Sequence, residues 1–302
     1  MKKHPFLIGF VIVSLAAMAF FAVVVGVFAI VERNDELSSV SSLWKDSVGV
    51  IEVNGVIESG DVVVEQIRKF AEDDKIRALL VRIDSPGGAV APTQEIYSEL
   101  RKVSQAGKPV VASMASAAAS GGYYIAAACD TIVANPGTLT GSIGVVMEFF
   151  SAEGAFDKLG LKSEVVKAGK YKDAGNLARA LTSDERRMLQ ATIDDVHGQF
   201  IAAVAEGRKL PIEQIEAIAD GRVFSGQQAQ AVGLVDQLGT FYDAVDVLKE
   251  KLQVEGKLNL VYPRKPQPSF TDFLLDGIFK RLPGLLGESG QKPPTTQGFS
   301  IR

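Results

Sequence analysis

The chain has 302 residues, which suits one large domain or two small ones with ample length for a hydrophobic core. Charged residues make up 23% of it and the formal net charge is -4, so the sequence lacks the excess of positive charge that is typical of nucleic-acid-binding proteins. It contains no GxGxxG, Walker loop, HExxH or CxxC motif, and we therefore expect neither a cofactor nor a metal site.

An uncharged apolar segment occupies residues 5–31. As a helix it would be about 40 Å long, enough to cross a bilayer core of about 30 Å. Ala17–Ala19 resembles a signal-peptide cleavage site, but cutting there would leave a long apolar stretch, so we expect an uncleaved anchor. Lys2 and Lys3 precede the segment and acidic residues follow it, which predicts a cytoplasmic N-terminus and an extracytoplasmic remainder.

A polar linker at residues 32–46 leads into an alternation of apolar runs and helical patterns. Such runs, rich in Val and Ile and separated by helices, are typical of a parallel sheet covered on both faces. We therefore predict an α/β fold over residues 47–262. The predicted strands are residues 48–57, 78–85 and 109–115, and the predicted helices between them are residues 62–73 and 93–105.

The stretch AAASGGYYIAAACD, residues 117–130, surrounds Ser120 with small side chains. A serine nucleophile needs room for a carbonyl group, a general base and two N–H donors for the oxyanion, and glycine lets an N–H approach closely. A second glycine-rich turn, DSPGGAV, follows the strand at residues 78–85. Strand-to-helix turns gather at one edge of a parallel sheet, so Gly87 and Gly88 could face Ser120. Composition alone leaves open that both turns serve only close packing.

A long helix is predicted at residues 183–206, where Thr182 and Glu185 form a plausible capping box. Its apolar face comprises Leu189, Ile193, Val196, Phe200 and Val204. Shorter helices are predicted within residues 212–253. The tail at residues 263–302 is rich in Pro and Gly, and we expect it to be flexible, with one amphipathic patch at residues 270–282 that docks or touches the membrane.

The general base could be a histidine or a lysine. His197 flanks the apolar face of the long helix, where we interpret it as an ordinary structural histidine, and His4 lies across the predicted membrane. Serine–lysine variants of the catalytic triad are the other option. The candidate lysines crowd into one short stretch, and their spacing does not choose between them: Lys162, Lys167, Lys170 and Lys172.

Five motifs occur in order between residues 48 and 250: IDSPGG, AASGGYYIA, TGSIGV, YKDAG and ADGRVFSGQQAQAVGLVDQLG. Together they resemble the signal peptide peptidase A family in its short, membrane-anchored bacterial form. This resemblance implies a Clp-protease/crotonase-like fold and a serine endopeptidase with a Ser-Lys dyad. On it, Ser120 is the nucleophile, Lys172 the general base and Ser142 the residue that orients the lysine, while Gly88 and Gly121 form the oxyanion hole.

The physical requirements of such a site fit these roles. A lysine base must be neutral, so its pKa must fall from about 10.4 through desolvation. Alanines, glycines and tyrosines would give an apolar pocket of that kind.

The resemblance also implies the setting of the enzyme. Its substrates would be remnant signal peptides and similar apolar peptides, and its protomers would share their clefts in a ring-like homo-oligomer. A single-pass anchor would hold it in the bacterial cytoplasmic membrane, with the catalytic domain on the extracytoplasmic side. A related membrane peptidase with other membrane-protein substrates and an inactive crotonase-fold scaffold remain as alternatives. An acyl-CoA enzyme of the crotonase type is disfavoured because acyl-CoA is cytoplasmic.

Overall fold

The computed structural model describes residues 18–21, 23 and 47–263. The chain divides into two units, Met1–Lys45 and Asp46–Arg302. In the first unit, the five described residues are helical and exposed. The rest of the predicted anchor, the linker at 32–46 and the tail from residue 264 lie outside the described residues. Within the described ranges, no helix is both long and apolar enough to cross a bilayer.

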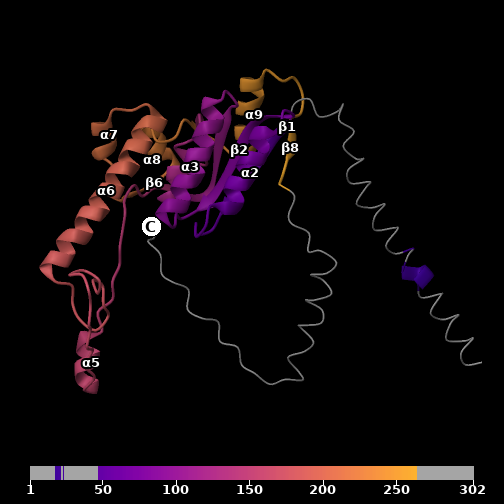
Figure 1. Ribbon diagram of the computed structural model, residues 1–302. Helices are drawn as coiled ribbons and strands as arrows, with labels where there is room; N and C mark the ends of the chain where they lie inside the picture. Colours follow the sequence, from indigo (N-terminus) through magenta and orange to yellow (C-terminus); the bar gives the residue numbers. More distant parts are fainter. Residues whose placement is uncertain (1–17, 22, 24–46, 264–302) are drawn as a thin grey trace, which may run out of the picture. The chain divides into compact units, whose positions relative to one another are not determined.

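The second unit is built on a sheet in which eight strands are described (Figure 1). The strands are β1 (Ser47–Asn54), β2 (Ile76–Ser85), β3 (Val110–Ala119), β4 (Thr131–Ala134), β5 (Leu139–Gly141), β6 (Val223–Ser225), β7 (Gln237–Leu238) and β8 (Asn259–Val261). Their order is β6-β5-β3-β2-β1-β8, with β4 between β3 and β7 on a branch. All described pairs are parallel except β5 with β6. The mostly parallel sheet confirms the predicted α/β class.

Helices follow most of these strands. They are α2 (Asp61–Glu72), α3 (Val90–Gln105), α4 (Gly121–Ala126), α5 (Glu153–Leu159), α6 (Ser183–Arg208), α7 (Ile212–Glu216), α8 (Gly226–Ala231) and α9 (Phe241–Leu252). The helices predicted within residues 47–262 therefore form, as do the three predicted strands. Strand β1 is shorter than predicted because Gly55, at φ 71°, turns the chain after Asn54.

The core lies on both faces of the sheet. Along β2, Leu79, Val81 and Ile83 pack into a cluster with α2, α3, α4 and α6, whereas Ala78 and Leu80 pack into a second cluster with α9. This alternation follows from the two-residue period of a strand. All five side chains are buried, and burying a large aliphatic side chain contributes about 1.5–3 kcal/mol.

Strand β3 changes its neighbour along its length. Its first half pairs with β4, and Ala117–Ala119 pair with β5 instead. On the other side, Ser85 at the end of β2 pairs with Ala118. The carboxyl ends of β2, β3 and β5 therefore meet at one edge of the sheet, and the chain leaves this edge at residues 86, 120 and 142.

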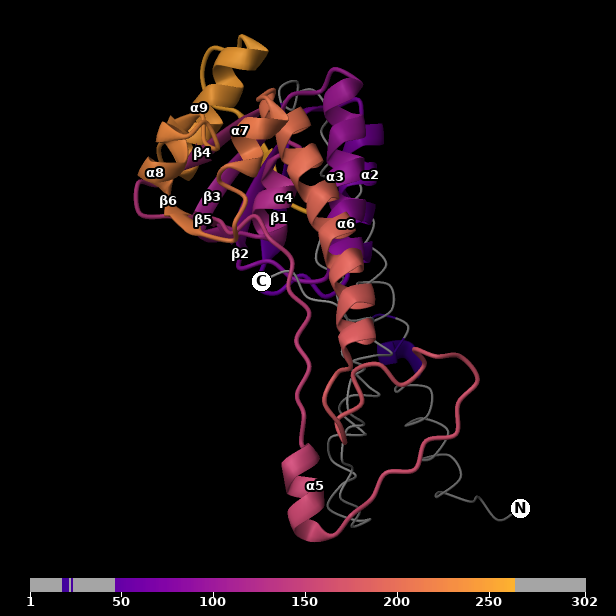
Figure 2. The ribbon, with the colours of Figure 1, turned by 90° about the vertical axis from the view of Figure 1, so that its left-hand side faces the viewer.

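Helix α6 extends beyond the sheet, and residues 146–182, here called the arm, lie around and beyond its N-terminal end (Figures 1 and 2). The predicted capping box is present. Thr182 Oγ1 accepts a hydrogen bond from the Glu185 amide, and the Glu185 carboxylate accepts one from the Thr182 amide. Phe200 and Val204, toward the C-terminal end of α6, are fully buried. Ile193, nearer the arm, is only half-buried. No residue of α5 is buried.

Candidate active site

Ser120 stands in a strained turn between β3 and α4. Its backbone has φ 52° and ψ -119°, a conformation that costs a residue with a side chain on the order of 1–3 kcal/mol. Two backbone hydrogen bonds hold it: the Ser120 amide donates to Gly141 O at 2.8 Å, and the Tyr124 amide donates to Ser120 O at 2.8 Å. Such a sharp strand-to-helix turn sets a nucleophile apart from both elements.

The Ser120 hydroxyl is a buried polar group without a partner. The residue is fully buried, and its Oγ makes no hydrogen bond with any described residue. Leaving such a group unsatisfied costs about 1–3 kcal/mol. Packing alone would favour alanine here, so the hydroxyl points to a chemical role.

Gly88 and Gly121 meet beside Ser120. A Cβ atom on Gly121 would lie 3.3 Å from the Gly88 nitrogen and 2.8 Å from Thr93 Oγ1. At Gly88, a Cβ atom would lie 2.2 Å from the carbonyl oxygen of Ile57, which forms an isolated parallel bridge with Gly88. No backbone hydrogen bond among the described residues uses the amide of either glycine as donor. The two glycines are thus brought together, and neither amide is used as a donor in the backbone hydrogen bonds of the described residues.

Ser142 lies at the same edge, one strand away. Gly141 at the end of β5 pairs with Ala119 of β3, so Ser120 and Ser142 follow paired positions. Ser142 also has a positive φ, 51°, and its amide donates to Arg222 O at 2.8 Å. Among the described residues other than glycine, positive φ otherwise occurs only where α6 and α9 end.

The tyrosines after the two glycines anchor α4. Tyr123 is fully buried and donates its hydroxyl to Leu234 O at 2.9 Å, and burial raises its pKa. Tyr124 packs against Tyr97 of α3 and Phe200 of α6, with ring centroids 5.0 and 4.7 Å away. These contacts fix the helix that begins directly after Ser120. Cys129, near the end of this stretch, is free and buried.

Lys172 makes no hydrogen bond with the Ser120 hydroxyl in the described part of the chain. It lies in the arm, it is exposed, and it makes no side-chain hydrogen bond in the described part of the chain. Lys167 and Lys170 are ion-paired with Asp173 and Asp184, and the Asp184 contact raises the pKa of Lys170. The raised pKa holds the Lys170 amine in its charged form, which makes Lys170 a poor base.

An apolar groove adjoins the glycine pair. It has a volume of about 300 Å³ and is bounded by the start of α3, by residues 145 and 147, and by α6. Ala89, which directly follows Gly88, lines it together with Val90 and Pro92, and Ile193 and Val196 line the facing side. Sequence reasoning assigned Ile193 and Val196 to helix packing, and no pattern in the sequence marks them as groove residues.

The chain matches a family model described as peptidase family S49 over residues 102–255. A relative from Synechocystis sp. is 49% identical over 201 residues, which cover 66% of this chain and 72% of the relative. Its name describes it as a candidate protease. The chain belongs to peptidase family S49.

Two further relatives carry protease names. Protease 4 of Salmonella typhi is 37% identical over 254 residues, which cover 81% of this chain and 41% of the relative. The chloroplastic serine protease SPPA of Arabidopsis thaliana is 34% identical over 249 residues, which cover 80% of this chain and 37% of the relative. The peptidase thus spans less than half the length of these two relatives. The family and the names identify it as a serine peptidase of the signal peptide peptidase A type, as the motifs predicted.

Proposed function

We propose that the chain is a membrane-anchored serine endopeptidase in which Ser120 is the nucleophile and Lys172 its general base. The observation that carries this proposal is the buried, unpartnered Ser120 hydroxyl beside two free amides, those of Gly88 and Gly121. A nucleophile next to a pair of N–H donors is what acyl transfer requires. The mostly parallel sheet, with these residues at its strand ends, agrees with the Clp-protease/crotonase-like fold that the motifs imply.

In this mechanism the neutral amine of Lys172 takes the proton of Ser120 while Oγ bonds to the peptide carbonyl carbon. The oxyanion accepts hydrogen bonds from the amides of Gly88 and Gly121. Breaking the C–N bond releases an amine that takes the proton from Lys172 and leaves an acyl-enzyme. Water then gives a proton to Lys172 and attacks the acyl carbon; as the ester C–O bond breaks, Lys172 returns that proton to Ser120 Oγ, which frees the serine and a carboxylic acid. Ser142 orients the lysine amine.

A second protomer supplies the base. Within one chain, Lys172 is exposed in the arm and the Ser120 hydroxyl is unpartnered. The arm also carries exposed apolar side chains, which on a protein surface mark interaction sites. They include Phe150, Leu159, Leu161, Val166 and Leu177. We infer a ring-like homo-oligomer in which the arm of one protomer brings Lys172 to Ser120 of the next.

The substrates are apolar peptides, including remnant signal peptides. The groove beside Gly88 is lined almost entirely by apolar side chains and can take one apolar side chain of a bound peptide. A single-pass anchor at residues 5–31 holds the enzyme in the bacterial cytoplasmic membrane, with the catalytic domain on the extracytoplasmic side. The uncharged segment and the lysines before it support this location.

Subunit mixing tests the shared site. Ser120→Ala and Lys172→Ala are each expected to be inactive alone. In rings assembled from equal amounts of both, about one quarter of the heterologous interfaces join an intact serine to an intact lysine, so about a quarter of the wild-type rate returns. Ser120→Ala mixed with the double variant is the control and stays inactive. No recovery in mixed rings argues against the shared cleft, and an active Lys172→Ala enzyme argues against the dyad.

A further inference from the structure

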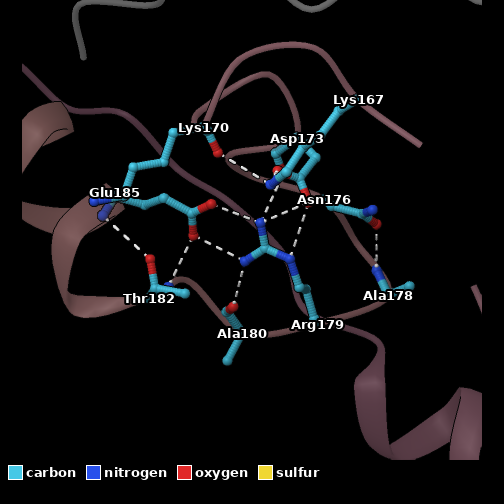
Figure 3. A network of polar contacts seen from close by, with 9 residues as sticks. All are labelled: Lys167, Lys170, Asp173, Asn176, Ala178, Arg179, Ala180, Thr182 and Glu185. Atoms are coloured by element: carbon cyan, nitrogen blue, oxygen red, sulfur yellow. Dashed lines mark hydrogen bonds and ion pairs between the residues drawn. The ribbon is translucent and has the colours of Figure 1, made fainter. Parts of the chain in front are cut away.

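The residue after Lys172 belongs to a network of ion pairs that ties the arm to α6 (Figure 3). The network, here called the Arg179 network, comprises Lys167, Asp173, Arg179, Thr182 and Glu185. Lys172 is not part of it.

Arg179 holds both the side chain and the backbone of Asp173. Its Nε donates to the Asp173 carboxylate at 3.3 Å, and its Nη2 lies 2.9 Å from that carboxylate. Nη2 also donates to the main-chain oxygen of Asp173 at 3.2 Å. The carboxylate accepts a further hydrogen bond from Lys167. The hydrogen bonds from Lys167 and then Arg179 lower the pKa of Asp173. The carboxylate therefore stays charged and paired with these two cations.

The same guanidinium is fixed to the first turn of α6. Arg179 Nη1 and Nη2 donate to the two carboxylate oxygens of Glu185 at 2.8 and 2.6 Å, a bidentate pair with a defined orientation. The Glu185 side chain is only 4% exposed and also accepts the Thr182 amide at 2.9 Å. Arg179, as the main cause, lowers the pKa of Glu185 to about 2. Arg179 therefore fixes the position of Asp173 relative to helix α6.

Lys172 differs from Lys167 and Lys170 because its amine has no acidic partner among the described residues. Its amide donates to Gly169 O at 3.3 Å, and a Cβ atom on Gly169 would lie 3.1 Å from Lys172 Cγ, so the stem of the lysine packs against this turn. Besides Lys172, the charged residues of the arm and the first turn of α6 are Glu148, Glu153, Asp157, Lys158, Lys162, Glu164, Lys167, Lys170, Asp173, Arg179, Asp184, Glu185, Arg186 and Arg187. The nearest acid in sequence, Asp173, is already taken by Lys167 and Arg179.

We propose that Arg179 is a positioning residue for Lys172: it fixes the turn that carries the lysine to α6 and draws the Asp173 carboxylate away from the lysine amine. This rests on the proposed function, in which Lys172 is the base. A carboxylate free to pair with the amine would stabilise the ammonium form, which cannot accept the serine proton. The network thus keeps the amine both oriented and available.

The test is the pH dependence of kcat/KM for cleavage of an apolar peptide by the full chain. Arg179→Met removes a positive charge and one of the two cations that hold the Asp173 carboxylate, and both changes favour the ammonium form of Lys172. We expect the midpoint of the rise in kcat/KM with pH to move to higher pH by about 0.5 units or more. Loss of position should also lower the alkaline plateau by about tenfold or more.

A second variant shifts the midpoint the other way. Asp173→Asn removes the negative charge beside Lys172, so the midpoint moves to lower pH. In the Arg179→Met background, the same change brings the midpoint back toward that of the wild type. Arg187→Met is the matched control, because it breaks an arginine–carboxylate pair at the same end of α6 with no contact to Asp173. We expect it to keep the wild-type midpoint and plateau.

Two results overturn the inference. One is a wild-type pH profile for Arg179→Met. The other is a lower alkaline plateau in both Arg179→Met and Asp173→Asn with the midpoint of the pH profile unchanged. The second result is what a merely structural role would give. Lys172→Ala is measured alongside them. If it keeps wild-type activity, the proposed function fails, whereas an inactive Lys172→Ala with an unmoved Arg179→Met midpoint refutes only the role of Arg179.

Discussion

A methyl group on Gly121 probes the oxyanion hole directly. In Gly121→Ala the new Cβ would lie 2.8 Å from Thr93 Oγ1 and 3.3 Å from the Gly88 nitrogen, so the two amides cannot keep their spacing. Loss of one oxyanion donor costs about 10²–10³ in kcat, or about 2.7–4 kcal/mol of transition-state stabilisation. Overpacking of this size also lowers the free energy of unfolding by about 1–3 kcal/mol. We expect kcat to fall about 100-fold, measured with a peptide substrate alongside urea unfolding.

A second substitution separates the catalytic effect from the packing effect. Thr93→Ala removes the closer contact, so Gly121→Ala/Thr93→Ala should regain most of the lost stability. The contact with the Gly88 nitrogen remains, and kcat should stay low. Gly137→Ala is the control, because a Cβ atom there meets nothing within 4 Å. A folded Gly121→Ala enzyme with kcat within about threefold of the wild type would refute the oxyanion assignment.

Three further predictions concern the base, the groove and the network. His197→Ala should keep most of the wild-type rate, whereas Lys172→Arg should lose it, because a guanidinium does not give up its proton; the opposite pair of rates would indicate a histidine-based site. Ile193→Gln should raise KM for apolar peptides with little change in kcat, and an unchanged KM would remove the groove from the substrate path. Glu185 has its pKa lowered from 4.5 to about 2, so it adds stability that is present above pH 4.5 and lost as the pH falls toward 2. Acid titration of unfolding should therefore show a shallower loss in Glu185→Gln, and equal slopes would count against this ion pair.

Much of the fold could be predicted because its signals are local. Strands β1, β2 and β3 are apolar runs, and a run of this kind needs a sheet covered on both faces. The start of α6 was predictable because a capping box is a contact between residues three apart. The short strands β5 and β8 were not predicted, since three residues show no period, and their formation depends on β3 and β1 lying beside them.

The site was predictable in its residue types and less so in its geometry. Glycines beside a serine indicated close approach, and the structure brings Gly88 and Gly121 together. The positive φ of Ser142 follows from pairing between β5 and its neighbours, which no local pattern encodes. Arg179 was missed for a related reason: an arginine six residues before a glutamate is common, and only the folded arm joins it to Asp173.

The most direct test of the central claim is covalent labelling with a fluorophosphonate, followed by mass-spectrometric mapping of the modified residue. A serine activated by Lys172 should carry the adduct at Ser120 in the wild type. The Lys172→Arg enzyme should lose most of the labelling rate, and Ser120→Ala should carry no adduct. An adduct on another residue, or Ser120 labelling at the wild-type rate in Lys172→Arg, would contradict the serine–lysine mechanism.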